Sequence, residues 1–305
     1  MTFRSFVEVY EADMKPRLKL NAWLTKRHII DTKILPYFGE KQLDQISPVD
    51  VMAWQNELRI TVNRRTRKPL SQTYLRTINN QLSAIINHAA RYYGLSDSPL
   101  RKVEKVGSAK AEEMRFWTKS EYLRFSDAVM DKPLSFTSFE VLYWMGIREG
   151  ELLALMPEDF DFGKLLLRIN KSYQRLQKRD VITSPKTPKS NRVLAMPEFL
   201  AEEVADYIRL FGIQDGERVF PIGKSYLYRE MERGCRASGV QRIRVHDLRH
   251  SHVSLLIELG FDVLAIADRV GHEAMDVTYR YAHLFPNVRA NMASALDKEG
   301  RSENE

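Results

Sequence analysis

The 305-residue sequence has a single cysteine, Cys235, and no long uninterrupted hydrophobic run. One cysteine excludes an internal disulfide and any zinc cluster built from cysteines of this chain, and it indicates a reducing compartment. No apolar stretch approaches the roughly 20 residues that a helix needs to cross a bilayer, and the first residues lack the apolar core of a signal peptide. We therefore expect a soluble, cytoplasmic protein without membrane contact.

The sequence also has no internal repeat and no long low-complexity tract, and its length suits two domains of ordinary size. Its basic residues are unevenly distributed. Residues 1–105 hold 18 Lys and Arg against 10 Asp and Glu, a net charge of +8, whereas residues 106–305 hold 29 against 30. Such an excess in one domain fits binding to a phosphate backbone, although a solvated basic surface has the same composition.

Helix signals dominate the first third of the chain. Ser47, Pro48 and Asp50 have the order of a capping hydroxyl, a first-turn proline and a first-turn acid. A second helix is predicted from Ser71, with apolar residues at helical spacing up to Gly94. A basic loop between the two helices would be costly to bury, so it faces either water or a polyanion. Its cations are Arg64, Arg65, Arg67 and Lys68.

A second domain is predicted after residues 105–114, which have little periodicity and form a linker. The domain begins with a capping box of Thr118 and Glu121. Short strands are predicted over 165–169, 180–184 and 192–196. The turn between the last two suggests a β-hairpin tip at Lys186, and helices are predicted again from Pro197 onward. The expected fold is therefore mainly α with a small β-sheet, an α+β domain after a helical domain.

Polar residues in this second domain have the chemistry to bind a phosphodiester. Arg148 precedes Glu151 by one helical turn, a spacing that by itself indicates a structural ion pair. His246 and Arg249 lie three residues apart and share a helix face. Two guanidiniums can each hold non-bridging oxygens in bidentate fashion, which is the charge neutralisation that other enzymes assign to Mg²⁺. A tyrosine such as Tyr281 becomes a nucleophile only with cationic neighbours, because a phenol has a pKa of about 10.

Three histidines of the same segment offer an alternative interpretation as a metal site. They are His246, His250 and His252. Positions i, i+4 and i+6 of a regular helix cannot all face one ion, and the glutamate of a zincin motif is missing. We therefore predict no metal, and packing or backbone-bonded roles for His250 and His252.

Four segments, taken in their order and spacing, resemble the tyrosine recombinase (phage integrase) family. They are Gly-Ile-Arg-Glu-Gly-Glu at 146–151, the Lys186 turn, His-Asp-Leu-Arg at 246–249, and Gly271-His272 followed nine residues on by Tyr281. The resemblance is to integrases of temperate phages and conjugative transposons. It implies a core-type DNA-binding domain and a catalytic domain that close as a C-shaped clamp around DNA. The implied bounds are 1–104 for the first domain, 105–114 for the linker, 115–286 for the catalytic domain and 287–305 for a C-terminal tail or helix. That tail either packs on its own chain or is exchanged between protomers.

The resemblance also implies roles for individual residues. The six implied catalytic residues are Arg148, Lys186, His246, Arg249, His272 and Tyr281. Arg148 would hold the scissile phosphate with Glu151 behind it, and Lys186 would protonate the leaving 5′ oxygen. Tyr281 would form a 3′-phosphotyrosine. Lys189 and Tyr279 are the alternatives for the general acid and the nucleophile.

The implied function is a site-specific DNA recombinase that integrates and excises a mobile element without metal, ATP or another cofactor. Its implied partners are double-stranded recombination sites, copies of itself in a homotetramer on DNA, and DNA-bending or excision accessory proteins, with a nucleoid-associated location. A type IB topoisomerase and a non-catalytic DNA-binding regulator of the same fold are the alternatives. Many integrases use an additional N-terminal domain to bind arm-type sites. The 305 residues do not include one, either by nature or because the chain is a fragment.

Overall fold

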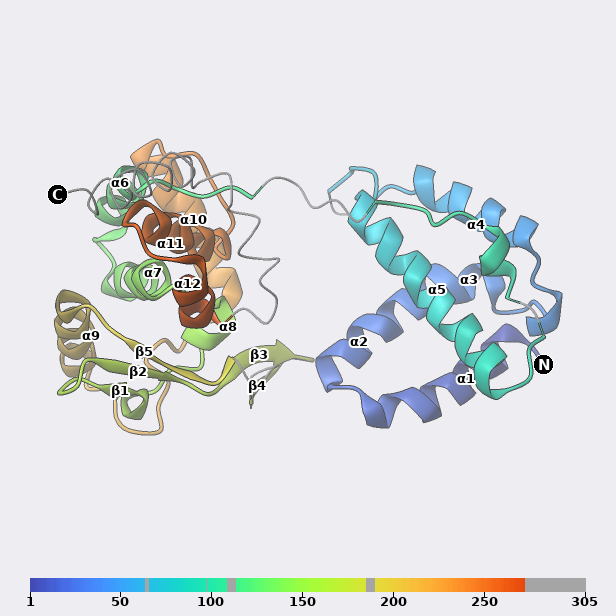
Figure 1. The fold of residues 1–305 in the computed structure, drawn as a ribbon, viewed down its shortest axis with the longest axis horizontal. Helices are drawn as coiled ribbons and strands as arrows, with labels where there is room; N and C mark the ends of the chain where they lie inside the picture. Colours follow the sequence, from blue (N-terminus) through green and yellow to red (C-terminus); the bar gives the residue numbers. More distant parts are fainter. Residues whose placement is uncertain (64–65, 97, 109–113, 185–189, 272–305) are drawn as a thin grey trace, which may run out of the picture. The chain divides into compact units, whose positions relative to one another are not determined.

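The structure is a computed structural model, and it describes residues 1–271 except 64–65, 97, 109–113 and 185–189. The chain divides between residues 113 and 114 into two compact units, each with its own hydrophobic core (Figure 1). In the described part of the chain, no helix is long and apolar enough to cross a membrane.

The regular elements among the described residues of the first unit are helices. Its helices are α1 (Phe3–Met14), α2 (Leu20–Ile29), α3 (Leu35–Phe38), α4 (Pro48–Ile60) and α5 (Gln72–Tyr92), with a π-helical turn at Ile30–Ile34. Both predicted helix starts are confirmed. The Ser47 hydroxyl accepts from the Asp50 backbone N–H at 3.2 Å, and the Asp50 carboxylate accepts from the Ser47 N–H at 2.9 Å. Ser71 caps α5 in the same way, by accepting from the Tyr74 N–H at 3.3 Å.

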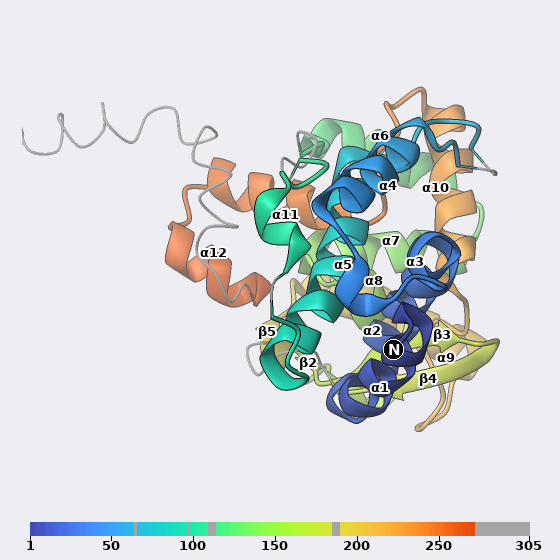
Figure 2. The same ribbon diagram turned by 90° about the vertical axis from the view of Figure 1, so that its right-hand side faces the viewer.

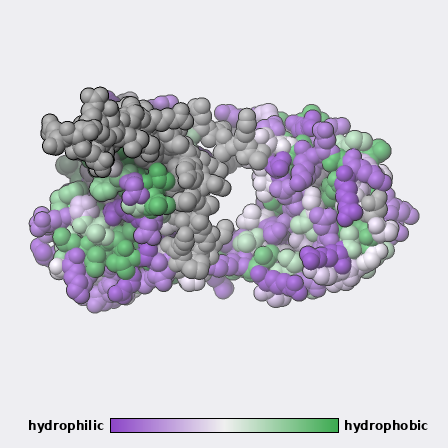
Figure 3. Space-filling view, viewed as in Figure 1, coloured by the Kyte–Doolittle hydropathy of each residue, from purple (hydrophilic) through white to green (hydrophobic). Residues whose placement is uncertain are grey.

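Aromatic residues of α1 pack against the long helix α5 in the first unit. Phe6 and Tyr10 are buried, and both rings contact His88 of α5. The Asp13 carboxylate accepts from the Tyr93 hydroxyl at 2.6 Å and lies 2.7 Å from His88 Nε2. The surface that faces the viewer in Figure 3 is mainly hydrophilic over this unit.

The second unit contains helices and two small antiparallel sheets (Figures 1 and 2). Its helices are α6 (Lys119–Val129), α7 (Pro133–Met145), α8 (Glu149–Leu152), α9 (Glu198–Phe211), α10 (Lys224–Ser238), α11 (Asp247–Glu258) and α12 (Val263–Val270). The predicted capping box at the start of α6 is confirmed, with the Thr118 hydroxyl accepting from the Glu121 N–H at 3.3 Å. Helix α6 packs on α7 and α10, and α11 packs on α7 and α12. The predicted mainly helical fold with a small sheet is confirmed.

The strands differ from the prediction in their pairing and in two strands that were not predicted, those at Phe160–Asp161 and Ser172–Leu176. They are β1 (Phe160–Asp161), β2 (Leu166–Ile169), β3 (Ser172–Leu176), β4 (Arg179–Thr183) and β5 (Arg192–Ala195). The predicted hairpin between the second and third expected strands is wrong: β4 pairs with β3, whereas β5 pairs with β2 in the other sheet. Lys186 therefore follows a hairpin instead of lying at its tip, because the hairpin turn is at Gln177 and Lys178. Residues 185–189 themselves lie outside the described residues.

Close packing at the turn from α7 into α8 fixes the backbone of the second unit around Arg148. Helix α7 ends at Gly146, whose φ of +61° is left-handed. A Cβ at Gly146 would lie 2.3 Å from Cδ2 of the buried His252 ring. Gly150 approaches strand β3 closely, since a Cβ there would lie 2.7 Å from Ser172 Oγ and 3.2 Å from the Tyr173 carbonyl oxygen. Side chains at either glycine would push α8 away from α11 or β3.

Candidate active site

Arg148 and Glu151 form a buried ion pair at the start of α8. The Glu151 side chain is only 3% exposed, and its Oε1 lies 2.7 Å from Arg148 Nη1. Its other oxygen accepts from the Arg148 backbone N–H at 2.9 Å and so closes a capping box. The Arg148 side chain is 35% exposed, so part of it reaches solvent. Glu151 therefore holds Arg148 from the protein side.

A second arginine, which the sequence analysis did not single out, holds the same carboxylate. Arg192, the first residue of β5, donates from Nη1 to Glu151 Oε1 at 3.2 Å and from Nη2 to Oε2 at 3.0 Å. Burial raises the pKa of Glu151, but the hydrogen bond and charge of Arg192, followed by the charge of Arg148, outweigh it and hold the pKa below its ordinary value. Glu151 is therefore ionised at neutral pH, between two guanidiniums.

Arg249 on α11 is buried, at 3% exposed, and ties two turns of the backbone together. Its Nη1 donates to the Gly146 carbonyl oxygen at 2.8 Å, and its Nη2 donates to the carbonyl oxygen of Val270. Buried guanidiniums require such partners because an unpaired buried charge is costly. The hydrogen bond to Gly146 brings α11 to the backbone two residues before Arg148.

Three arginines converge on consecutive carbonyl groups at the end of α12. Arg192 Nε donates to the Arg269 carbonyl oxygen at 3.1 Å, Arg249 Nη2 donates to that of Val270, and Arg148 Nη2 donates to that of Gly271 at 3.0 Å. Carbonyl groups at a helix C-terminus carry partial negative charge and have no partner within the helix. The arginines satisfy them and gather three positive charges one to three residues before position 272.

His246 lies at the N-cap of α11, beside this cluster, and its side chain reaches solvent. Partial burial lowers its pKa, and the charges of Arg249 and Arg148 lower it further, while Asp247 acts in the opposite direction. The lowered pKa favours a neutral His246 imidazole at neutral pH. The structure brings Arg148, Arg249, His246 and Glu151 together.

The other predicted site residues lie outside the described residues. They are Arg64, Arg65, Lys186, His272 and Tyr281, with the alternatives Lys189 and Tyr279. The ends of two of the segments that carry them contact Arg148. Ser190, directly after residues 185–189, places its hydroxyl 3.3 Å from Arg148 Nη1, and Gly271 accepts from Nη2 of the same side chain. Arg67 and Lys68 are exposed on the turn between α4 and α5.

The remaining histidines of α11 are packed against protein. His252 is buried, its Nε2 accepts from Arg269 Nε at 3.2 Å, and burial lowers its pKa to about 3. Burial also lowers the pKa of His250, to about 4, and its ring meets that of His246 edge-on. Within residues 1–271, outside the gaps given above, no group of three His, Cys, Asp or Glu side chains is arranged to hold a metal ion.

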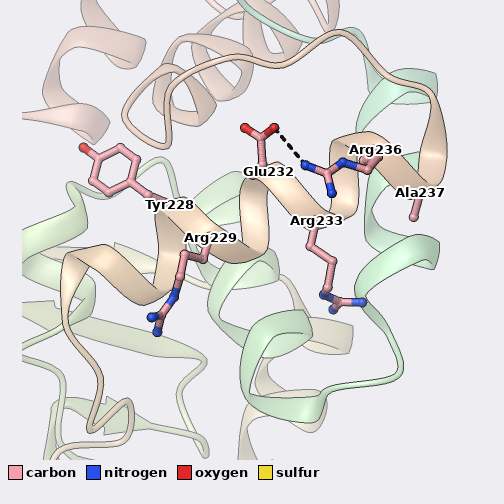
Figure 4. Close-up of a pocket in the computed structure, with 6 residues that line it drawn as sticks. All are labelled: Tyr228, Arg229, Glu232, Arg233, Arg236 and Ala237. Carbon is pink, nitrogen blue, oxygen red and sulfur yellow. Dashed lines mark hydrogen bonds and ion pairs between the residues drawn. The ribbon is translucent and has the colours of Figure 1, made fainter. Parts of the chain in front are cut away.

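A separate depression of about 540 Å³ lies along α10 (Figure 4). Its lining residues are Tyr228, Arg229, Glu232, Arg233, Arg236 and Ala237. Two of its arginines are paired with carboxylates, Arg233 with Asp131 and Arg236 with Glu232. It is not the site that holds Arg148 and Glu151, whose hydrogen-bond partners lie in α8, at Ser190 and Arg192 around the start of β5, and at Gly271 directly after α12.

The second unit thus holds one buried glutamate between arginines from separate elements, next to a small sheet. Two family models match the chain: the phage integrase N-terminal SAM-like domain over residues 2–59, and the phage integrase family over residues 111–287. The chain belongs to the phage integrase family.

Relatives and solved structures agree with this assignment. The chain is 29% identical to the ICEBs1 integrase of Bacillus subtilis (strain 168), over 97% of this chain and 83% of that protein. It is 26% identical to a putative prophage phiRv2 integrase of Mycobacterium tuberculosis, over 89% of this chain and 72% of that protein. Its fold is similar to that of the Tn1549 transposon integrase in complex with transposon right end DNA, with a TM-score of 0.76, 18% identity, and coverage of 96% of this chain and 99% of that one. The predicted family and the predicted function, site-specific recombination by an integrase, are confirmed.

Proposed function

We propose that this integrase cleaves and rejoins DNA through Tyr281, with Arg148 and Arg249 as the ligands of the scissile phosphate. The observation that carries the proposal is the convergence of Arg148, Arg249 and Arg192 on the carbonyl groups of residues 269–271, next to His272 in the sequence. Those carbonyl oxygens accept hydrogen bonds from arginine N–H groups, and an arginine can offer the same groups to a phosphate in bidentate fashion. Bound phosphate would compete for the same donors.

The chemical step transfers the phosphoryl group from the DNA 5′ oxygen to the tyrosine. The Tyr281 oxygen forms a bond to phosphorus as the bond to the 5′ oxygen breaks, and the phenol proton passes to water. Lys186 supplies a proton to the leaving oxygen, with Lys189 as the alternative donor. Arg148 and Arg249 neutralise the charge of the pentacoordinate phosphorus, and His246 and His272 donate hydrogen bonds to it. The product is a 3′-phosphotyrosine and a free 5′ hydroxyl.

Reversal of this step joins the DNA to a partner strand. The phosphodiester energy is retained in the tyrosine ester, so religation requires neither ATP nor a metal ion. Integration and excision then differ only in which sites are brought together. A tetramer would hold two duplexes, and the solved structures similar in fold include a lambda integrase tetramer bound to a Holliday junction, with a TM-score of 0.66 and 18% identity.

DNA binding is assigned to basic surfaces of both units, which would close around the duplex as a C-shaped clamp. Residues 1–105 carry the net charge of +8. In this unit the turn with Arg67 and Lys68, together with Arg64 and Arg65, would contact phosphates. In the second unit the exposed Arg229 of the α10 depression adds a further cation (Figure 4). Residues 287–305 would link protomers, and DNA-bending or excision proteins would act on the assembled complex.

Conservative replacement of the buried arginine tests the proposal. Arg249→Lys keeps a positive charge but loses the fork that reaches both Gly146 and Val270. We expect single-turnover cleavage of a recombination site to fall by about 10²- to 10³-fold, as when one transition-state donor is removed. Arg209→Lys on α9, at 77% side-chain exposure, is the control that should leave cleavage unchanged.

Two outcomes would redirect the proposal. Unaltered cleavage by Arg249→Lys contradicts the phosphate-binding role. Relaxation of supercoiled plasmid without exchange between two sites indicates a type IB topoisomerase instead of a recombinase.

A further inference from the structure

Arg192 is nearly buried, with 8% of its side chain exposed, and every N–H edge of its guanidinium has an acceptor. Nη1 and Nη2 donate to the two oxygens of Glu151, Nε donates to the Arg269 carbonyl oxygen, and Nη1 also donates to the Ser190 carbonyl oxygen at 3.2 Å. One side chain thus joins three segments: α8, the end of α12, and the start of β5. Each of these segments borders a residue with a role in the proposed reaction.

Arg192 decides the net charge of the cluster that it forms with Arg148 and Glu151. Arg148 and Glu151 alone are a neutral pair, whereas Arg148, Glu151 and Arg192 together carry one positive charge. Glu151 and Arg192 are largely shielded from water, at 3% and 8% side-chain exposure, so their charges act strongly on Arg148. A phosphate that approaches Arg148 therefore meets one more positive charge while Arg192 offsets the carboxylate.

Stability alone does not account for this arrangement. Buried ion pairs and triads lose hydration that their mutual attraction barely repays, and apolar residues of similar volume often stabilise a fold as well or better. Strand β5 already pairs with β2 through its backbone over Arg192–Ala195. The charged triad is thus better explained by what it does to Arg148 than by what it adds to the sheet.

We propose that Arg192 is a positioning residue of the recombination reaction: it holds Glu151 in place and offsets its charge, so that Arg148 presents an uncompensated positive charge to the scissile phosphate. The inference rests on the proposed function. Arg192 does not touch DNA in this role, and it acts through Glu151. Its loss should therefore lower the rate of the chemical step and leave DNA affinity unchanged.

The test uses Arg192→Gln and Arg192→Lys in the full chain. A nicked duplex that carries the recombination site traps the covalent complex, and a fluorescent duplex gives the Kd. For Arg192→Gln we expect covalent complex formation to slow by about 10- to 100-fold, as for loss of a residue that orients an active-site ligand. The Kd should change by less than about twofold. Arg192→Lys should recover part of the rate, because it restores the charge.

Lys171→Gln is the matched control. Lys171 is also a shielded cation, at 20% side-chain exposure, and its Nζ lies 2.8 Å from the buried Asp159 carboxylate instead of Glu151. Its replacement removes one charge and breaks one buried pair in the same unit. Cleavage at the wild-type rate is expected. If Lys171→Gln slowed cleavage as much as Arg192→Gln, a general loss of structure would explain both.

A double-mutant cycle separates positioning from structural support. In a Glu151→Gln background there is no carboxylate to offset, so adding Arg192→Gln should slow cleavage by no more than about twofold. A further loss as large as that in the wild-type background would overturn the proposal, as would wild-type cleavage by Arg192→Gln. A wild-type protein that binds the site but forms no covalent complex would instead overturn the proposed function, and the Arg192 role with it.

Discussion

A substitution at Gly146 should disturb both the backbone of the second unit and the candidate active site. It ends α7 with a φ of +61°, and its carbonyl oxygen accepts from Arg249 Nη1 at 2.8 Å. The nearest atoms to a Cβ built there are Cδ2 and Cγ of His252, at 2.3 and 2.8 Å. That ring is 2% exposed, so it has no open space into which to move.

Two separate costs should follow from Gly146→Ala. An alanine in the left-handed region costs about 1 to 2 kcal/mol. Overpacking against a buried ring adds about 1 to 3 kcal/mol. We therefore expect the free energy of unfolding of the second unit to fall by about 2 to 5 kcal/mol.

Gly212→Ala is the matched control. Gly212 ends α9 with the same φ of +61°, but a Cβ there meets nothing within 4 Å. Urea denaturation of both variants should give a loss of about 1 to 2 kcal/mol for Gly212→Ala and a larger loss for Gly146→Ala. Equal losses would refute the predicted clash with His252. In conditions where both variants are folded, only Gly146→Ala should slow DNA cleavage.

Two further predictions concern buried groups of the second unit. The pKa of His252 is about 3 in the fold and about 6.5 in an unfolded chain, so the histidine stabilises the fold above pH 6.5 and this stability is lost as the pH falls toward 3. Urea unfolding between pH 6 and 5 should therefore show a slope smaller by about 1 kcal/mol per pH unit in His252→Gln than in wild type, and identical slopes would contradict a neutral buried imidazole. Gly234→Ala should lower the unfolding free energy by about 1 to 2 kcal/mol, because its Cβ would lie 2.4 Å from Phe125 and 2.6 Å from Val129, a cost that exceeds the gain in helix propensity. A more stable Gly234→Ala protein would show that α6 can move away from α10.

Local sequence signals predicted the helix starts because their physics is local. Ser47, Ser71 and Thr118 each bond a backbone N–H three residues on, and this requires no knowledge of distant parts of the chain. Strand β3 gave no comparable signal. Its turn to β4 consists of Gln177 and Lys178, which both adopt positive φ, of 49° and 67°. Such turns favour glycine and asparagine, so no residue at these two positions predicts a hairpin.

Part of the candidate active site was also predicted, but through a family resemblance and not through local physics. Arg148, Glu151, His246 and Arg249 were found through the resemblance to a known family, since each is unremarkable by itself. Arg192 escaped notice because an arginine in a short alternating strand usually points to solvent. Its burial comes from pairing with Glu151, 41 residues earlier in the chain, and from the Arg269 carbonyl group, 77 residues later. Contacts of that range depend on the assembled fold.

The most direct measurement is covalent capture on nicked duplexes taken from the flanks of the encoding element, followed by denaturing gels of wild type, Tyr281→Phe and Tyr279→Phe. Cleavage through Tyr281 predicts a covalent protein–DNA band with wild type and Tyr279→Phe and none with Tyr281→Phe. A band that persists in Tyr281→Phe would contradict the assignment of the nucleophile. Duplexes that wild type binds but never captures would contradict the enzymatic mechanism itself.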